Sequence, residues 1–315
     1  MRLLSSLFLC TSLFAQTARP PASSQPPDET PNFRADTRLV VLPISVADRN
    51  GKLITDLQQR AFKVYENGVE QPIKIFKRED VPISLGIIID NSGSMKEKRQ
   101  KVETASMDLV KASNKQDEVF IVNFNDDAWL DVPFTSDIKA LEDGVAKIDS
   151  RGGTAMRDAI SLSLDYLKKE GKRQKKVLLV ITDGNDNASS ISLEKLVTRA
   201  QNDEVLIYAI GLLNEEERRE AKIARRALDS LSRESGGVAF YPKGVAEVDQ
   251  IALQVAHEIR NQYTIAYSPI IQAMDGSFRQ IKVTVNGPGH PVVRTRTGYY
   301  ATPDTSVPKA LSQAR

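Results

Sequence analysis

The stretch Ile87–Met95 reads IIIDNSGSM and joins a hydrophobic segment directly to a run of small, oxygen-bearing residues. Three consecutive isoleucines predict a strand that is buried on both faces. Asp90, Ser92 and Ser94 follow at alternate positions where that strand ends. Because polar atoms crowded at the end of a hydrophobic strand need partners, this arrangement indicates a place where a ligand is held.

A second hydrophobic segment ends in the same way. The sequence KKVLLVITDG runs through apolar residues into Asp183, and hydrophobic strands alternate with amphipathic helices from Pro82 to about Arg260. This alternation predicts an α/β fold, a doubly wound and mostly parallel sheet with helices on both faces. In such sheets, ligands bind beyond the carboxyl ends of the strands.

The segments on either side of this region have β patterns. In Arg38–Glu79, the sequence FKVYENGVEQPIKIFK predicts two strands joined by a tight hairpin turn at Asn67-Gly68, and Pro43 favours a sheet edge or a bulge because it lacks an N–H. In Gln262–Tyr300, the sequences FRQIKVTVN and VVRTRTGYY predict a half-buried antiparallel hairpin. Each segment is too short to form a stable β domain alone, so we expect the two to pack together as one small β-sandwich.

The first 18 residues have the outline of a secretory signal peptide. Arg2 precedes an apolar run from Leu3 to Phe14 that is too short to span a membrane. The only cysteine, Cys10, lies in this run, and the bulky residues before it disfavour lipid attachment. The mature chain would then be secreted, to the periplasm or the exterior, without disulfides, thiol catalysis or a cysteine-ligated metal.

Composition and missing motifs argue against other classes of function. The formal net charge is +2 with 27% charged residues, and no dense tract of Lys or Arg interrupts the balance. Neither nucleic acid nor an anionic membrane is therefore an expected partner. The sequence has no GxxxxGK[ST] phosphate loop and no GxSxG nucleophile motif, so we do not expect an enzyme.

Three separated segments place oxygen-bearing side chains at the same predicted sheet edge. Strand ends and the loops between strands and helices meet there, so we expect one cluster. Its members are Asp90, Ser92, Ser94, Thr154 and Asp183. With no histidine or thiol among them, these donors select a hard divalent cation, Mg²⁺ first, with Mn²⁺ and Ca²⁺ as alternatives.

These residues carry a resemblance to a known family. DNSGS, the threonine of RGGT and the aspartate of ITDG resemble the three parts of the metal-ion-dependent adhesion site (MIDAS) of von Willebrand factor type A domains. The resemblance implies that Ser92 and Ser94 bind the cation directly, Thr154 directly or through water, and the two aspartates mostly through water. The flanking β segments resemble, more loosely, those of secreted acidobacterial proteins that carry this domain.

The resemblance implies a type A, Rossmann-like domain inserted between the two β segments. The expected order is a signal peptide (1–18), a Pro-rich linker (19–35), a β segment (36–81), the type A domain (82–261), a second β segment (262–302) and a flexible tail (303–315). We expect Ser92 and Thr154 at the surface edge of the domain, so that their removal would abolish binding and leave the fold intact. Asp158, Asp186 and Asn187 are interpreted as helix-start or solvated loop residues.

The function expected from this site is metal-dependent adhesion to a protein partner. Neutral hydroxyl ligands would leave a dication electron-poor, and an Asp or Glu of the partner would then complete its ligands. One alternative is a scaffold in envelope assembly that keeps the fold and does not bind metal. The other is a Mg²⁺-dependent phosphohydrolase that forms an aspartyl phosphate. That class of enzyme has an Asp-x-Asp motif, so it would need a second carboxylate where Ser92 stands.

Overall fold

The computed structural model describes residues 38–78, 80–145, 151–213, 218–287 and 289–302. These residues belong to a single compact unit. The predicted signal peptide with Cys10, the Pro-rich linker and the C-terminal tail lie outside the described residues. Within the described part of the chain, no helix combines the length and the apolar character needed to cross a membrane.

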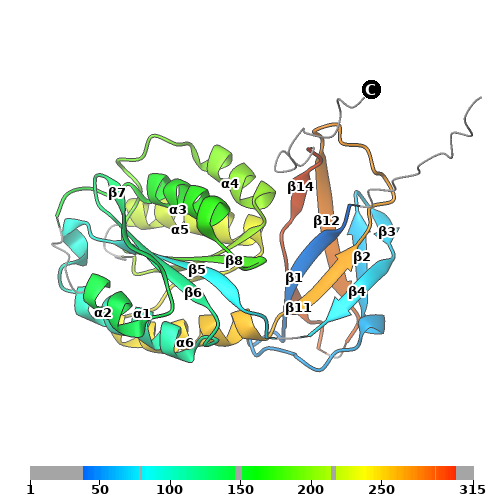
Figure 1. Cartoon of the computed structure of the whole chain (residues 1–315), viewed down its shortest axis with the longest axis horizontal. Coiled ribbons are helices and arrows are strands. Elements are labelled where there is room, and N and C mark those ends of the chain that lie inside the picture. The colour runs from blue at the N-terminus through cyan, green and yellow to red at the C-terminus, as the bar shows by residue number, and fades with distance from the viewer. Residues whose placement is uncertain (1–37, 79, 146–150, 214–217, 288, 303–315) are drawn as a thin grey trace, which may run out of the picture. The chain divides into compact units, whose positions relative to one another are not determined.

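A six-stranded sheet forms the centre of the α/β region, with the strand order β10-β9-β8-β5-β6-β7 (Figure 1). All neighbouring strands are parallel except β7, which is antiparallel to β6. The strands are β5 (Ile83–Asp90), β6 (Glu118–Phe124), β7 (Ala128–Thr135), β8 (Lys175–Thr182), β9 (Val205–Gly211) and β10 (Ala239–Phe240). Every residue of β5 is buried, as its continuous apolar sequence predicts.

Helices cover both faces of this sheet (Figure 1). The α-helices are α1 (Arg99–Ala112), α2 (Ile138–Val145), α3 (Met156–Glu170), α4 (Leu193–Asn202), α5 (Arg218–Ser235) and α6 (Val248–Arg260). The 3-10 helices are η1 (Gln59–Ala61), η2 (Gly93–Met95) and η3 (Val245–Glu247). One hydrophobic core lies between the sheet and α1, α2 and α6, and a second lies between the sheet and α3, α4 and α5.

The flanking segments form two four-stranded antiparallel sheets, ordered β13-β1-β11-β4 and β14-β12-β2-β3. Their strands are β1 (Val40–Ala47), β2 (Phe62–Glu66), β3 (Val69–Gln71), β4 (Ile73–Lys77), β11 (Tyr263–Tyr267), β12 (Phe278–Val285), β13 (Val292–Arg294) and β14 (Gly298–Tyr300). Strands from the two ends of the chain pair with each other, β1 with β11 and β12 with β2. They share one core, and the predicted fold class is confirmed. The domain boundaries stay a prediction.

The predicted hairpin at Asn67-Gly68 joins β2 to β3, and both residues have positive φ, 48° and 82°. We expected its second strand to continue to the end of the segment, and that was wrong. The chain breaks at Pro72, which has no N–H for a ladder, and β4 then pairs with β11 in the other sheet. At Pro43, β1 pairs with β11 on one side, while β13 pairs only with the later residues of β1, so the proline lies at a locally unpaired edge.

The predicted C-terminal hairpin is also corrected. VVRTRTGYY does not form one strand beside β12; it forms β13, which pairs with β1, and β14, which pairs with β12. Between them the Arg296 side chain turns into the protein, where it donates to the backbone oxygens of Val41 and Gln201. This buried guanidinium anchors the chain as it crosses from one sheet to the other.

Candidate functional site

Asp90 ends β5 at the carboxyl edge of the central sheet and is 1% exposed. Its carboxylate accepts hydrogen bonds from the Ser92 N–H at 2.8 Å and from the Thr182 hydroxyl at 2.6 Å. Burial raises the pKa of Asp90 to about 6 although these hydrogen bonds act in the opposite direction, and nearby Asp183 adds to the increase. The edge is therefore a buried place where negative charge is costly without a cation.

The two serines continue from Asp90 into η2. The Ser92 and Ser94 side-chain oxygens lie 3.2 Å apart, and the Ser94 hydroxyl donates to an Asp183 carboxylate oxygen at 2.8 Å. Met95, the last residue of η2, is buried in the hydrophobic core and anchors this turn to the domain. The motif of the first loop and the aspartate after β8 are thus joined by direct contacts.

Asp183 follows the last residue of β8 and has a partner that sequence reasoning missed. The Lys98 ammonium lies 2.5 Å from its second carboxylate oxygen, and the Asp183 side chain is 1% exposed. The spacing carried a weak signal, because Lys98 stands four residues after Ser94, just before α1, where its side chain can turn back to the loop.

Thr154 stands in a loop whose glycines allow a close approach. Gly152 has φ 78°, and a Cβ placed there would lie 2.2 Å from the Asp126 carboxylate. The Gly153 N–H donates to that carboxylate at 2.7 Å. Asp126, from the loop between β6 and β7, therefore fixes the backbone just before Thr154.

Backbone contacts bring the Thr154 loop to the other two segments. The Arg151 N–H donates to the Asn91 carbonyl at 2.9 Å, between Asp90 and Ser92 in sequence. A Cβ built at Gly184 would lie 3.6 Å from the Thr154 hydroxyl oxygen, so Thr154 lies beside the residue that follows Asp183. All three predicted segments meet at this edge of the sheet.

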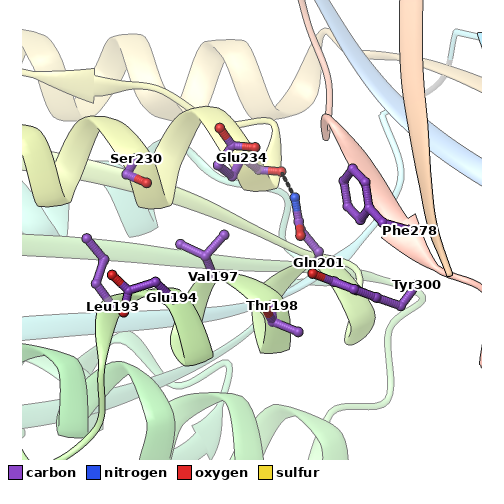
Figure 2. A pocket seen from close by; sticks show the side chains of 9 residues that line it. All are labelled: Leu193, Glu194, Val197, Thr198, Gln201, Ser230, Glu234, Phe278 and Tyr300. Atoms are coloured by element: carbon purple, nitrogen blue, oxygen red, sulfur yellow. Dashed lines mark hydrogen bonds between the residues drawn. The ribbon is translucent and has the colours of Figure 1, made fainter. Parts of the chain in front are cut away.

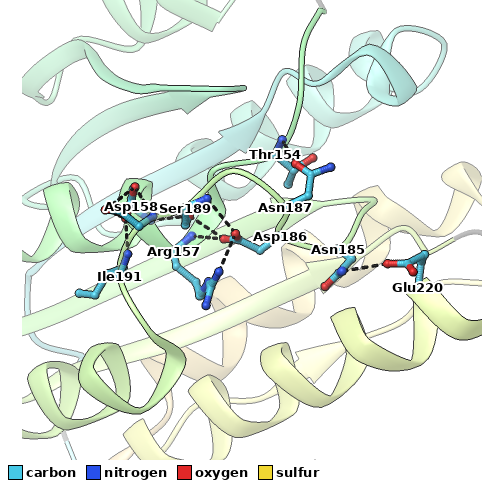
Figure 3. Close-up of polar contacts among 10 residues, drawn as sticks. Thr154, Arg157, Asp158, Asn185, Asp186, Asn187, Ser189, Ile191 and Glu220 are labelled. Atoms are coloured by element: carbon cyan, nitrogen blue, oxygen red, sulfur yellow. Dashed lines mark hydrogen bonds and ion pairs between the residues drawn. The ribbon is translucent and has the colours of Figure 1, made fainter.

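The loop after Asp183 is braced against the start of α3 (Figure 3). The Asn187 side-chain oxygen accepts from the Thr154 N–H at 2.9 Å. Asp186 accepts from the Arg157 N–H at 2.7 Å and from the Ser189 hydroxyl at 2.7 Å, and its side chain is 6% exposed. We interpreted both residues as helix-start or solvated loop residues. That interpretation is wrong for the largely buried Asp186 side chain, while Asn187 is exposed and also makes this hydrogen bond.

Asp158 lies in the first turn of α3, as we expected, and also reaches across to this loop. Its carboxylate accepts from the N–H groups of Ser190 and Ile191 at 2.9 and 3.1 Å. Burial would raise the pKa of Asp158, but these hydrogen bonds outweigh it and the net pKa is lowered. The charged form of Asp158 thus helps to fix the loop.

Our expectation of an exposed position for Ser92 and Thr154 is wrong. Ser94 is exposed, whereas Ser92 and Thr154 are 3% and 5% exposed. The reason is the close contact between loops described above, which covers both side chains. Substitutions at Ser92 and Thr154 must therefore be controlled for effects on folding.

The five residues fit a hard divalent cation. They supply two carboxylates and three hydroxyls, donors that Mg²⁺, Mn²⁺ and Ca²⁺ accept, and a positively charged group already contacts one carboxylate. Among the residues that the structure describes, no three His, Cys, Asp or Glu side chains form a metal-binding cluster. A site with only two carboxylates agrees with that finding. The assignment of the five residues as metal ligands stays a prediction.

A pocket of about 360 Å³ lies elsewhere, lined by α4, α5 and the aromatic side chains of Phe278 and Tyr300 (Figure 2). Two of its lining residues are joined by a hydrogen bond, in which the Gln201 side-chain amide donates to the Glu234 backbone oxygen at 3.4 Å. None of the five site residues lines this pocket. It is therefore separate from the candidate site.

Comparison with known families and proteins gives several matches, and that of the family model lies in the α/β region. The family model of the von Willebrand factor type A domain matches residues 85–254, just over half of the chain. An uncharacterized protein of Borreliella burgdorferi is 29% identical over 157 residues, which are 45% of this chain and 46% of that protein. Integrin alpha-11 of Mus musculus is 32% identical over 110 residues, 33% of this chain and 9% of the integrin. The matched part thus spans less than half of each relative's length.

The comparison with solved structures gives matches at low sequence identity and with TM-scores below 0.5. A von Willebrand factor type A protein from Catenulispora acidiphila has a TM-score of 0.49 and 12% identity, over 87% of this chain and 76% of the other. The vWF domain of the pilus tip protein Mfa5 from Porphyromonas gingivalis has a TM-score of 0.46 and 12% identity, over 57% and 97%. The resemblance to acidobacterial proteins is not tested by these matches.

Proposed function

Because this chain belongs to the von Willebrand factor type A domain family, we propose that it is a secreted binding protein that holds a divalent cation at Asp90, Ser92, Ser94, Thr154 and Asp183. We propose further that it binds an Asp or Glu of a protein partner there. The family's fold is often used in adhesion and protein binding. The signal-peptide pattern of the first 18 residues supports secretion.

One observation carries the proposal. Oxygen-bearing side chains from three separate segments meet at one sheet edge, and Ser94 links the first segment to Asp183 at 2.8 Å. The two carboxylates, Asp90 and Asp183, are buried, so a nearby cation would offset the cost of their charges. Such a set of oxygen donors suits a hard dication, and none of the five side chains is a histidine or a thiol.

The partner chemistry follows from the charges of the donors. Three of the five side chains are neutral hydroxyls, so a bound dication would still attract a further anionic oxygen. Ser94 is the exposed member and places this edge within reach of a partner. A carboxylate of a protein partner is anionic and could reach this exposed edge.

The first experiment measures binding of the cation alone. Titration calorimetry of the full secreted chain with MgCl₂ and MnCl₂ is expected to show saturable binding, which EDTA removes. Thr154→Ala is expected to weaken it strongly, and Thr104→Ala, an exposed threonine on α1, is the matched control. Circular dichroism of both variants separates lost binding from lost folding, which matters because Thr154 is buried.

The second experiment captures the partner. The immobilised chain is incubated with envelope and culture fractions of the native organism in Mg²⁺ or in EDTA, and retained proteins are identified by mass spectrometry. The proposal expects a partner that is retained only with Mg²⁺ and lost when its contacting Asp or Glu is replaced. Equal retention in EDTA would contradict adhesion through the cation.

The scaffold without metal is the second candidate, and one observation favours it. Lys98 already neutralises Asp183 at 2.5 Å, which is what a site without a metal would need. The calorimetric titration decides between the two, because the scaffold predicts no heat of binding and no stabilisation by Mg²⁺ or Mn²⁺.

A further inference from the structure

We propose that Lys98 is a built-in competitor of the divalent cation: its ammonium holds Asp183 in the cation-free protein and leaves when the cation binds. This inference rests on the proposed metal site and concerns how that site is regulated. It assigns a role to a residue outside the five predicted ligands.

The first support is geometric. The Lys98 nitrogen lies 2.5 Å from one Asp183 oxygen, while the Ser94 hydroxyl donates to the other oxygen at 2.8 Å. Both oxygens of Asp183 are therefore occupied by protein donors. Each oxygen keeps a second lone pair, but a dication facing Asp183, directly or through water, would be repelled by the Lys98 ammonium, so the cation and Lys98 compete for the same carboxylate.

The second support is burial. The Asp183 side chain is 1% exposed, and an isolated carboxylate in such a place pays a large desolvation cost. Asp90 lies close enough to raise that cost by repulsion. Lys98 places a positive charge beside Asp183 in the absence of metal and so helps to keep the loop in place.

The third support is that the Lys98 side chain can move away from Asp183. It is 25% exposed, and Lys98 is the residue just before α1. The side chain can therefore rotate into solvent without moving the strand ends. A dication next to Asp183 would repel the ammonium, and lysine has a flexible stem and a strongly hydrated head. The exchange therefore needs one side-chain rotation and no change of fold.

The consequence is a lower affinity for the cation together with a stable cation-free state. Each cation that binds displaces the charge-assisted hydrogen bond between Lys98 and Asp183. Losing such a bond corresponds to a roughly ten- to hundredfold decrease in affinity for the cation. A partner carboxylate that adds its own binding to the cation would help to displace Lys98. Cation and partner would thus bind cooperatively, with Lys98 as the element that both displace.

The test compares three variants of the full chain. Lys98→Met keeps the stem and removes the charge, Lys98→Arg keeps a charge that can pair with Asp183, and Lys96→Met removes an exposed charge two residues away. Titration with MgCl₂ alone is expected to give a Kd for Lys98→Met that is roughly ten- to hundredfold lower than for wild type. Lys96→Met and Lys98→Arg should stay within a few-fold of wild type.

Thermal melting provides the second readout. In EDTA, Lys98→Met should melt below wild type because Asp183 loses its counter-ion, and saturating Mg²⁺ should remove this difference. A Lys98→Met variant that binds Mg²⁺ no more tightly than Lys96→Met overturns the competitor role, while binding by wild type leaves the proposed function standing. Absence of Mg²⁺ and Mn²⁺ binding in wild type and all variants overturns the proposed function itself.

Discussion

The side-chain oxygen of Asn187 accepts a hydrogen bond from the backbone N–H of Thr154 at 2.9 Å, and the Thr154 carbonyl accepts one from the Asn187 N–H at 3.1 Å. These reciprocal bonds join the loop after β8 to the loop before α3. An exposed asparagine thereby fixes the backbone of a buried threonine that belongs to the candidate site.

Asn187→Ala is therefore expected to weaken cation binding while the domain stays folded. Loss of one neutral hydrogen bond corresponds to about 1 kcal/mol, or roughly fivefold in Kd for Mg²⁺. Titration calorimetry measures the change. Asn185→Ala is the matched control, because Asn185 stands in the same loop but its amide bonds to Glu220. Equal effects of the two substitutions would show that Asn187 has no specific role.

Gly86 lies in β5, the strand that Asp90 ends, and packs closely against the neighbouring strands β6 and β8. A Cβ at Gly86 would lie 2.3 Å from the Phe120 ring and 2.6 Å from Leu178. Gly86→Ala should therefore lower the free energy of unfolding by about 1–3 kcal/mol, the usual cost of overpacking a core. Urea denaturation measures this value. Gly244→Ala is the control, since nothing lies within 4 Å of a Cβ there, and it should change stability little.

The parts of the site that could be predicted from the sequence are those encoded locally. Asp90 and Asp183 each end an apolar run, and the fold itself brings such ends to one edge. Thr154 was identified by its glycines, one of which does take positive φ. Residues of this kind carry their signal within a few positions of the chain.

The parts that could not be predicted depend on contacts between distant residues. Asn187 meets Thr154 across 33 positions, and Lys98 meets Asp183 across 85. No local pattern marks Asn187 as anything other than a loop residue. The same holds for Arg296, where the chain passes from one β-sheet to the other. Its side chain donates to the carbonyl oxygens of Val41 and Gln201, which are far away in the sequence.

The β-sandwich contains a buried acid that two tyrosines hold. Glu66 is 3% exposed and accepts from the Tyr267 hydroxyl at 2.7 Å and from the Tyr299 hydroxyl at 2.9 Å. Tyr267→Phe should cost about 1.5–3 kcal/mol of unfolding free energy, because a buried charge loses a hydrogen bond. Tyr65→Phe, on the half-buried neighbour of Glu66 in β2, is the control for urea denaturation. A cost no larger than that of the control would mean that the remaining tyrosine suffices.

Lys175, at the start of β8, provides a test by pH. It donates to the Ile259 carbonyl at 2.5 Å, and burial lowers its pKa from 10.5 to about 8, although Asp80, Asp117 and Glu258 oppose that decrease. Between pH 8 and 10.5 the unfolded chain binds more protons at this position than the folded one, so this residue makes the unfolding free energy rise with pH in that window.

Lys175→Met should remove that rise. Measured by urea denaturation, the unfolding free energy of wild type minus that of Lys175→Met is expected to increase by about 2–3 kcal/mol from pH 7 to pH 10, since one pKa unit corresponds to about 1.4 kcal/mol. Taking the difference between the two proteins cancels the titration of other groups that both share. Lys176→Met, at the next position of β8, should show no such increase. A difference that stays constant with pH would mean that Lys175 remains charged in the folded protein, held by the three carboxylates around it.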